Sequence, residues 1–376
     1  MIYLDCNATT PIEPSVQAAC LEFLAQEYGN AGSRTHEYGA RAKAAVIQAR
    51  ARIAELLDVD ADGVIFTSGA TESNNLAILG LVAGLKKSSK PLHLITSLQE
   101  HKAVLEPMQH LEKQGCEVTY LQPSKNGIVS AESLRAALRP ETVLVSLMHV
   151  NNETGVIQPL AAYAEILKNH TAYFHVDAAQ SFGKLVSELR NPRVDLLSAS
   201  GHKIYAPKGI GVLVMRERDY IQPPIVPLMF GGGQEKGVRP GTLPVHLIVG
   251  LGEAARLALK DHEKRAARCL AFKQKALEAL IAAGGVVNGD LDHALPSTLN
   301  IAFPGADSEA LILALKDVIA ISNGSACTSA SYTFSHVLTA MDLPREQVKG
   351  ALRLSWCHLT PAVDWDIVKQ RLKVLL

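Results

Sequence analysis

Two polar side chains end strand-like runs about one α/β unit apart, and their chemistry is complementary. Lys203 follows the run at 195–200 behind small and hydrogen-bonding residues, and Asp177 ends the apolar run at 172–176. Either residue alone is more often a surface charge, because lysines and aspartates are common at strand ends. Together they supply the Schiff-base amine and the acid beside a pyridinium nitrogen that a pyridoxal phosphate site requires.

Residues 66–75 form a pattern of strand, small-residue turn and helix start. Backbone amides at a helix N-terminus bind anions, and Thr71 can add a hydroxyl group to a phosphate oxygen. The alternative is that Thr71 only caps the helix. The segment lacks the lysine of a P-loop, which argues against a nucleoside triphosphate.

Two further loops follow strand-like runs where a sheet presents ligand-binding residues. His101 follows the run at 92–96, and Asn152 follows the run at 143–148. A histidine there can stack on an aromatic ring, and an asparagine can hold a phenolic oxygen or a carboxylate. The alternative for His101 is a structural hydrogen bond.

Cys327 and Arg353 are the candidate reactive groups near the C-terminus. Cys327 lies in a run of small and polar residues that cannot anchor a core, so its thiol should be exposed and mobile. Arg353 lies between apolar residues of a strand-like run, where it either holds a carboxylate or is a surface charge on an edge strand.

Bulk composition fits an ordinary enzyme-sized chain. The 376 residues carry 37 basic and 37 acidic side chains, so no net basic charge attracts a nucleic-acid backbone. The six cysteines have neither metal-site spacing nor disulfide-scaffold density. No signal peptide or membrane span is expected, and we therefore expect a cytoplasmic protein.

Helical and strand patterns alternate along the chain, which predicts an α/β fold around a mainly parallel sheet. Ligands should then gather at the carboxyl ends of the strands. Predicted helices cover 38–57, 72–85 and 104–114, and predicted strands cover 64–67, 92–96, 118–121, 143–148, 172–176, 297–303, 318–321 and 351–355. No element is predicted between the prolines at 11 and 14 and residue 38.

A long helical stretch at 245–283, expected to break near Asp261, should connect two domains. We predict a large cofactor-binding domain at 14–256. A small α+β domain at 1–13 and 257–376 should carry the Cys327 loop.

Taken in order, the motifs resemble those of class I cysteine desulfurases, the NifS/IscS-like branch of fold-type-I pyridoxal phosphate enzymes. The resemblance covers nearly the whole chain. It rests on residues 3–11, 29–33 and 68–72, the segments around Asn152, Asp177 and Lys203, residues 239–242 and the loop around Cys327.

The resemblance implies a role for each site residue. Lys203 forms the Schiff base, Asp177 pairs with the ring nitrogen, and Gln180 bonds the phenolic oxygen. His101 stacks on the ring and is a catalytic residue that moves protons. Ala70 contacts the cofactor, and the implied phosphate ligands are Thr71, Ser200, His202 and, from the other subunit of a homodimer, Thr242. Asn152 and Arg353 receive the substrate carboxylate, and Asn152 also contacts the cofactor.

The implied reaction converts L-cysteine to L-alanine and leaves a persulfide on Cys327 for a sulfur-acceptor protein. Residues 5–10 and 325–333 look closest to desulfurases of DNA phosphorothioation systems (DndA type). Iron-sulfur or tRNA-thiolation donors, a selenocysteine lyase, an aminotransferase and a non-catalytic relay are the alternatives. Cys357, where the family usually has glycine, and Pro240, where many members have serine, depart from the pattern.

Overall fold

The computed structural model describes residues 1–85, 91–323 and 334–375. Its centre is a seven-stranded sheet in which only β8 runs against the other strands. In spatial order the strands are β2 (Val64–Thr67), β8 (Gly211–Met215), β7 (Leu196–Ser200), β6 (Tyr173–Asp177), β5 (Thr142–Met148), β3 (His93–Ser97) and β4 (Glu117–Leu121). The predicted α/β fold with a mainly parallel sheet is confirmed.

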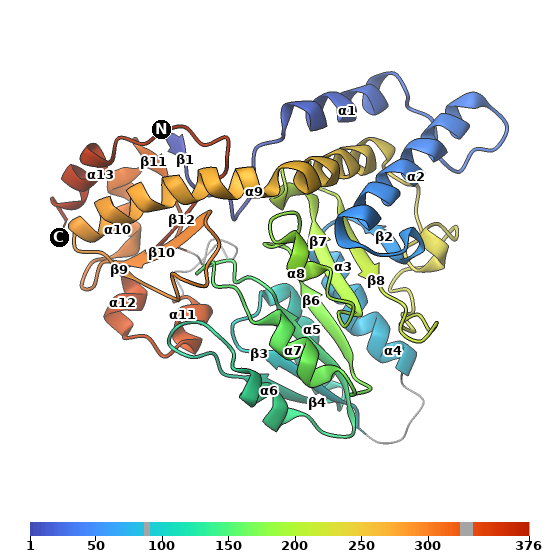
Figure 1. The fold of residues 1–376 in the computed structure, drawn as a ribbon, viewed down its shortest axis with the longest axis horizontal. Coiled ribbons are helices and arrows are strands. Elements are labelled where there is room, and N and C mark those ends of the chain that lie inside the picture. The colour runs from blue at the N-terminus through green and yellow to red at the C-terminus, as the bar shows by residue number, and fades with distance from the viewer. Residues whose placement is uncertain (86–90, 324–333, 376) are drawn as a thin grey trace.

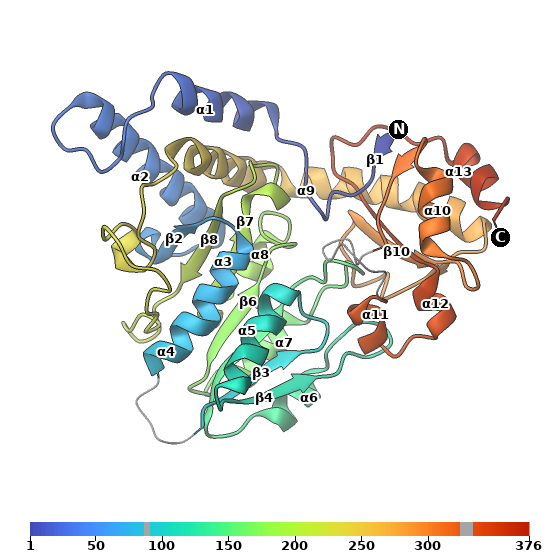
Figure 2. The same ribbon diagram turned by 180° about the vertical axis from the view of Figure 1, so that it is seen from behind.

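Helices cover both faces of this sheet (Figures 1 and 2). One face packs against α2 (Glu37–Leu57), α7 (Leu160–Leu167) and the first half of α9 (Val245–Ala282). The other face packs against α5 (Lys102–Lys113) and the helical run 70–85. Most strand residues are buried, as expected of a parallel sheet covered on both sides.

The helical run 70–85 leaves the sheet from the end of β2. It consists of α3 (Ala70–Asn75), a π-helical turn (Leu76–Gly80) and α4 (Leu81–Leu85). The predicted strands all begin and end within one residue of the observed ones. The prediction missed α1 (Pro14–Ala25), which starts at a proline and buries only Val16, so its apolar pattern is weak.

Helix α9 is continuous from Val245 to Ala282, so the predicted break near Asp261 is wrong. Residues 256–268 contain no glycine or proline, and their charged side chains are tolerated on a solvent-facing helix surface. The helix runs along both parts of the molecule in Figure 1. The domain boundary at residue 256, which falls inside this helix, stays a prediction.

The smaller part of the molecule combines the C-terminal residues with the start of the chain. An antiparallel sheet contains β12 (Ala351–Ser355), β10 (Thr298–Ala302) and β9 (Val286–Val287), and β1 (Ile2–Tyr3) pairs in parallel with β11 (Ile319–Ala320). The smaller part also contains the helices α10 (Ser308–Leu315), α11 (His336–Ala340), α12 (Arg345–Lys349) and α13 (Trp365–Leu372). Helices α6 (Ala131–Ala137) and α8 (Val186–Leu189) instead pack into the core of the seven-stranded sheet. Within the described ranges, no helix has the length and apolar character needed to cross a membrane.

A close backbone approach between β8 and the turn before α3 requires glycine at position 211. A Cβ atom there would lie 2.5 Å from the Gly69 Cα atom and 2.6 Å from the Ala199 carbonyl oxygen. The Gly69 atom cannot move without displacing the start of the helical run 70–85, and the Ala199 carbonyl oxygen belongs to the neighbouring strand β7. Gly211 therefore fixes how the turn sits on the sheet.

We predict that Gly211→Ala lowers the free energy of unfolding by about 1–3 kcal/mol, the usual cost of overpacking. Urea unfolding of the purified protein measures it. Gly32→Ala is the matched control, because the added Cβ would meet only a side-chain oxygen, 3.2 Å away. Equal unfolding midpoints for Gly211→Ala and the unmodified protein would contradict this packing argument.

Candidate active site

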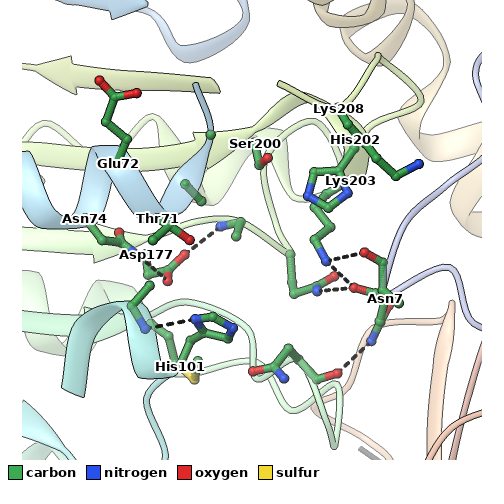
Figure 3. A pocket seen from close by; sticks show the side chains of 18 of the residues that line it. Asn7, Thr71, Glu72, Asn74, His101, Asp177, Ser200, His202, Lys203 and Lys208 are labelled. Carbon is green, nitrogen blue, oxygen red and sulfur yellow. Dashed lines mark hydrogen bonds between the residues drawn. The ribbon is translucent and has the colours of Figure 1, made fainter. Parts of the chain in front are cut away.

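The carboxyl ends of the parallel strands open into a cavity of about 480 Å³, which also contacts the N-terminal segment and β12 (Figure 3). Strands β3, β5, β6 and β7 deliver the loops that line it, as expected for a sheet of this kind. The cavity collects these predicted site residues: Ala70, Thr71, His101, Asn152, Asp177, Gln180, Ser200, His202, Lys203 and Arg353.

Lys203 reaches the cavity from the short turn that follows β7. Its Nζ atom donates hydrogen bonds to the backbone carbonyl of Asn7 and, at 2.9 Å, to that of Ala8. The Gln180 side chain donates to the same Asn7 carbonyl at 3.0 Å. The N-terminal segment therefore positions both the amine and the amide of the site, a role that the sequence did not reveal for Asn7.

Asp177 ends β6 on the other side of the cavity (Figure 3). One carboxylate oxygen accepts a hydrogen bond from Asn74 Nδ2 at 2.8 Å, and the other accepts from the Ala179 backbone amide at 2.9 Å. The residue is only 4 % exposed. Both contacts donate to carboxylate oxygens, so they hold the Asp177 carboxylate in a fixed orientation at the cavity wall.

Asn74 is a site residue that sequence reasoning missed. It lies in α3 one turn beyond the predicted anion site, and its side chain is fully buried. Five consecutive polar residues, 71–75, precede the apolar part of the helical run and were the available signal. The pairing with Asp177 joins residues 103 positions apart, which no local pattern indicates.

His101 occupies the N-cap position of α5, and its Nδ1 atom accepts a hydrogen bond from the Ala103 amide at 3.0 Å. Burial lowers the pKa of this ring, Asp177 opposes the shift, and Lys203 adds to it. The accepting Nδ1 atom must lack a proton, so the ring is neutral with its proton on Nε2. The structural hydrogen bond considered for His101 is therefore present, and the ring still lines the cavity.

The end of the cavity where the sequence predicts a phosphate lies at the start of the helical run 70–85. Gly69 stands at the N-cap position and supplies no side-chain cap, so Thr71 is a first-turn residue rather than the cap. Burial, with help from Lys203 and Lys208, lowers the pKa of His202 to about 4. Its Nδ1 atom lies 3.2 Å from Thr9 Oγ1. A neutral His202 ring can donate a hydrogen bond to an anion, and it places no second positive charge beside Lys203.

Arg353 is not a surface charge, although β12 is an edge strand of its sheet. Its side chain is 4 % exposed, and Nη2 lies 2.7 Å from Asp5 Oδ1. Nη1 donates to the Asn152 carbonyl at 3.2 Å. Buried Nε has no hydrogen-bond partner among the described residues. A guanidinium group so placed in a cavity wall has capacity left for a carboxylate.

Of the predicted site residues that the structure describes, Thr242 is not brought into this cavity. It is exposed, and its predicted role belongs to the other subunit of a dimer. Cys327 lies outside the described residues.

Glu100 is a second buried group that the sequence reasoning did not single out. Its Oε1 atom accepts from the Met148 amide at 2.9 Å and from Ser97 Oγ at 2.7 Å. Oε2 is buried without a partner among the described residues. Burial raises the pKa of this carboxyl group to about 8. The acid is therefore mostly protonated at neutral pH, and it adds no charge behind His101.

The residues fit pyridoxal phosphate in chemistry as well as in position. A buried carboxylate that accepts two hydrogen bonds suits the ring nitrogen, an uncapped helix start suits the phosphate, and a lysine reaches the space between them. The buried Gln180 Oε1 atom lacks a partner among the described residues. This fold and site define a fold-type-I pyridoxal phosphate enzyme.

Comparison with known proteins narrows the class. The Aminotransferase class-V family model matches residues 2–367. The cysteine desulfurase IscS of Vibrio vulnificus (strain YJ016) is 46% identical over 376 residues, covering 99% of this chain and 92% of the relative. A solved NifS-like protein has a TM-score of 0.91 at 34% identity, covering 99% of this chain and 98% of that one. DndA from Streptomyces lividans has a TM-score of 0.83 at 47% identity, covering 93% and 98%.

The chain therefore belongs to the class-V aminotransferase family, in its branch of NifS/IscS-like class I cysteine desulfurases. It is a pyridoxal phosphate-dependent enzyme that acts on cysteine, as its resemblance predicts. The fold class, enzyme class and cofactor predicted from the sequence are confirmed. The roles of the single site residues stay predictions.

The raised pKa of Glu100 predicts a pH-dependent stability. An unfolded glutamate has a pKa of about 4.3, so between that pH and about 8 only the folded state holds the proton. The contribution is fully present below the lower value and is lost as the pH rises through the upper one. The free energy of unfolding should fall by up to roughly 1.4 kcal/mol per pH unit from this group.

The Glu100→Gln side chain resembles the protonated acid and does not titrate. The substitution should therefore remove the fall in the free energy of unfolding with pH that Glu100 causes. Chemical unfolding from pH about 5 to about 8 measures the slope in both proteins. The matched control is Glu106→Gln, at an exposed glutamate of α5. Parallel pH profiles for Glu100→Gln and the unmodified enzyme would contradict a protonated Glu100.

Proposed function

We propose that the enzyme takes the sulfur of L-cysteine onto Cys327 as a persulfide, releases L-alanine, and passes the sulfur to an acceptor protein. The observation that carries the proposal is the convergence of Lys203, Asp177 and Arg353 on one cavity of an established cysteine desulfurase fold. Bound pyridoxal phosphate supplies an electron sink for the pair left on the substrate Cα atom. The protein groups position the substrate and move its protons.

Lys203 is the proton carrier in this proposal. Its Nζ atom, held beside the Asn7 and Ala8 carbonyl groups, takes the proton from the substrate Cα atom and returns a proton to complete alanine. Asp177 would hold a proton on the ring nitrogen of the bound cofactor, which would then accept electrons more readily. The neutral His101 ring would stack on the cofactor without adding a charge beside Asp177 and Lys203.

Arg353 and Asn152 are proposed to receive the substrate carboxylate. The guanidinium group is anchored by Asp5 and by the Asn152 carbonyl, and Arg353 lines the cavity wall. An arginine held this way favours substrates that carry an α-carboxylate, because it forms a charge-assisted hydrogen bond with that group.

Cys327 is the proposed nucleophile. Its thiolate attacks the substrate sulfur, a new S–S bond forms, the Cβ–S bond breaks, and the electron pair returns to the substrate carbon. The support is sequence context, since the loop of small and polar residues at 324–331 lets the sulfur leave the pocket. An aminotransferase would not need this residue.

We predict that Cys327→Ala keeps the visible absorbance of lysine-bound cofactor and loses sulfide release from cysteine by at least about 100-fold, as expected for loss of a covalent nucleophile. Cys20→Ala, at a half-buried cysteine of α1, is the control with unchanged turnover. Lys203→Ala should lose the absorbance band. Undiminished sulfide release by Cys327→Ala would sink the persulfide mechanism.

The pathway proposal is DNA phosphorothioation by a cytoplasmic homodimer. It is supported by the likeness to DndA at 47% identity and by the sequences at 5–10 and 325–333. In the dimer, Thr242 of one subunit would complete the phosphate site of the other. The balanced charge of the chain suits delivery of sulfur to a protein rather than direct contact with DNA.

Deleting the gene in its native host tests the pathway. Phosphorothioate linkages, measured by mass spectrometry of digested genomic DNA, should disappear and return with the unmodified gene but not with Cys327→Ala. Genomic DNA that keeps its phosphorothioate, with loss of iron-sulfur enzyme activities instead, would identify the alternative iron-sulfur role.

A further inference from the structure

Two buried thiols lie together behind the Lys203 turn and outside the catalytic cavity. Cys6 is 3 % exposed and Cys357 is 4 % exposed, and both are free. They form a small buried cluster with Tyr205, two residues after Lys203. The reaction proposed above uses neither thiol.

The backbone holds these cysteines on neighbouring segments. Asp5 pairs with Ser355 in parallel, the Cys6 amide donates to the Ser355 carbonyl at 3.0 Å, and the Asn7 amide donates to Ser355 Oγ at 2.8 Å. Adjacent extended segments lie about 4.8 Å apart, within the Cα separation of roughly 4.4–6.8 Å that a disulfide needs. The Cys6 and Cys357 side chains belong to one buried cluster, and each perturbs the pKa of the other.

The environments of the two thiols differ in a way that assigns an order of reaction. The hydrogen bond from Cys6, opposed by burial and helped by Thr360, lowers the pKa of Cys357 to about 6. The same contact and burial raise the pKa of Cys6. Lys184 interacts electrostatically with both sulfur atoms. The Thr360 hydroxyl donates to Cys357 Sγ, 3.6 Å away, which favours the Cys357 thiolate, so we assign Cys357 as the nucleophile and Cys6 as the resolving thiol.

A small molecule can approach this pair from outside the catalytic cavity. Both cysteines line a separate cavity of about 390 Å³ that also contacts Thr9, Thr10 and Pro11. At its edge, Tyr3 and Leu359 are each 41% exposed. The neighbouring Cys269 does not line this cavity, and burial raises its pKa to about 12, so it stays a thiol.

We propose that Cys6 and Cys357 form a redox-active site that a low-molecular-weight disulfide converts into an intramolecular disulfide. The Cys357 thiolate attacks the small disulfide, whose S–S bond breaks and releases one thiolate. Cys6 then gives up its proton and attacks the Cys357 sulfur, which releases the second thiol. Two protein thiols are oxidised by two electrons, and the small disulfide is reduced to two thiols.

The bridge would act on the catalytic site through Asn7 and Tyr205. Closing it draws the sulfur atoms to about 2.05 Å. Cys6 is followed directly by Asn7, whose carbonyl accepts from Lys203 and Gln180. Tyr205 lies in the same buried cluster as both cysteines and has φ +70°, a strained conformation next to the lysine turn. The oxidised enzyme should therefore turn over cysteine more slowly.

Glutathione disulfide tests the chemistry on Cys327→Ala holoenzyme, which removes the exposed thiol from the readout. Intact mass should fall by about 2 Da, and non-reducing peptide mapping should join Cys6 to Cys357, reversibly with dithiothreitol. Cys357→Ala should show no mass loss, and Cys20→Ala should behave like its parent. Cofactor absorbance verifies that each variant is folded. No cross-link, or one to Cys269, would overturn the proposal.

Turnover measurements on enzymes that retain Cys327 test the coupling to catalysis. After identical glutathione disulfide treatment, kcat should fall several-fold more in the unmodified enzyme than in Cys6→Ala or Cys357→Ala. Equal losses in all three enzymes would contradict the coupling. The cross-link itself is measured without Cys327, so its absence would leave the proposed persulfide reaction unaffected.

Discussion

The hydrogen bonds from Lys203 to the Asn7 and Ala8 carbonyl groups join the chemistry of the sheet to the first residues of the chain. That segment is in turn held by the smaller part of the molecule, because Asp5 pairs with Arg353 and the Asn7 side chain bonds to the Asn152 carbonyl and to Thr298. A shift of the N-terminal segment would move the lysine and the arginine relative to each other. The cavity therefore has this geometry only when the N-terminal segment packs against both the sheet and the smaller part of the molecule.

Burial arranges the charges of the cavity by removing those that would interfere. His101 and His202 are neutral because burial lowers the pKa of both rings, and Glu100 is mostly protonated because burial raises its pKa. Asp177 and Arg353 stay available for ionic contacts because each has hydrogen-bonding partners for its charged form. Charges of this kind act strongly on a bound molecule, since few water molecules or competing ions screen them.

The elements could be predicted well because their signals are local. Strand β2 has its predicted bounds since a buried parallel strand reads as a short apolar run. The break predicted in α9 was wrong because charged residues such as the half-buried Asp261 do not interrupt a helix. Long-range contacts were beyond prediction: the buried pairing of Arg353 with Asp5 and that of Asn74 with Asp177 join residues with no common pattern. The resemblance supplied roles for Asp177 and Arg353 that their spacing alone left open.

The most direct test of the account is a crystal structure of the holoenzyme with pyridoxal phosphate. The account predicts continuous electron density from Lys203 Nζ to the cofactor, Asp177 within hydrogen-bonding distance of the ring nitrogen, and the phosphate at the start of the helical run 70–85. Density that joins the cofactor to another lysine, or a ring whose nitrogen points away from Asp177, would contradict it.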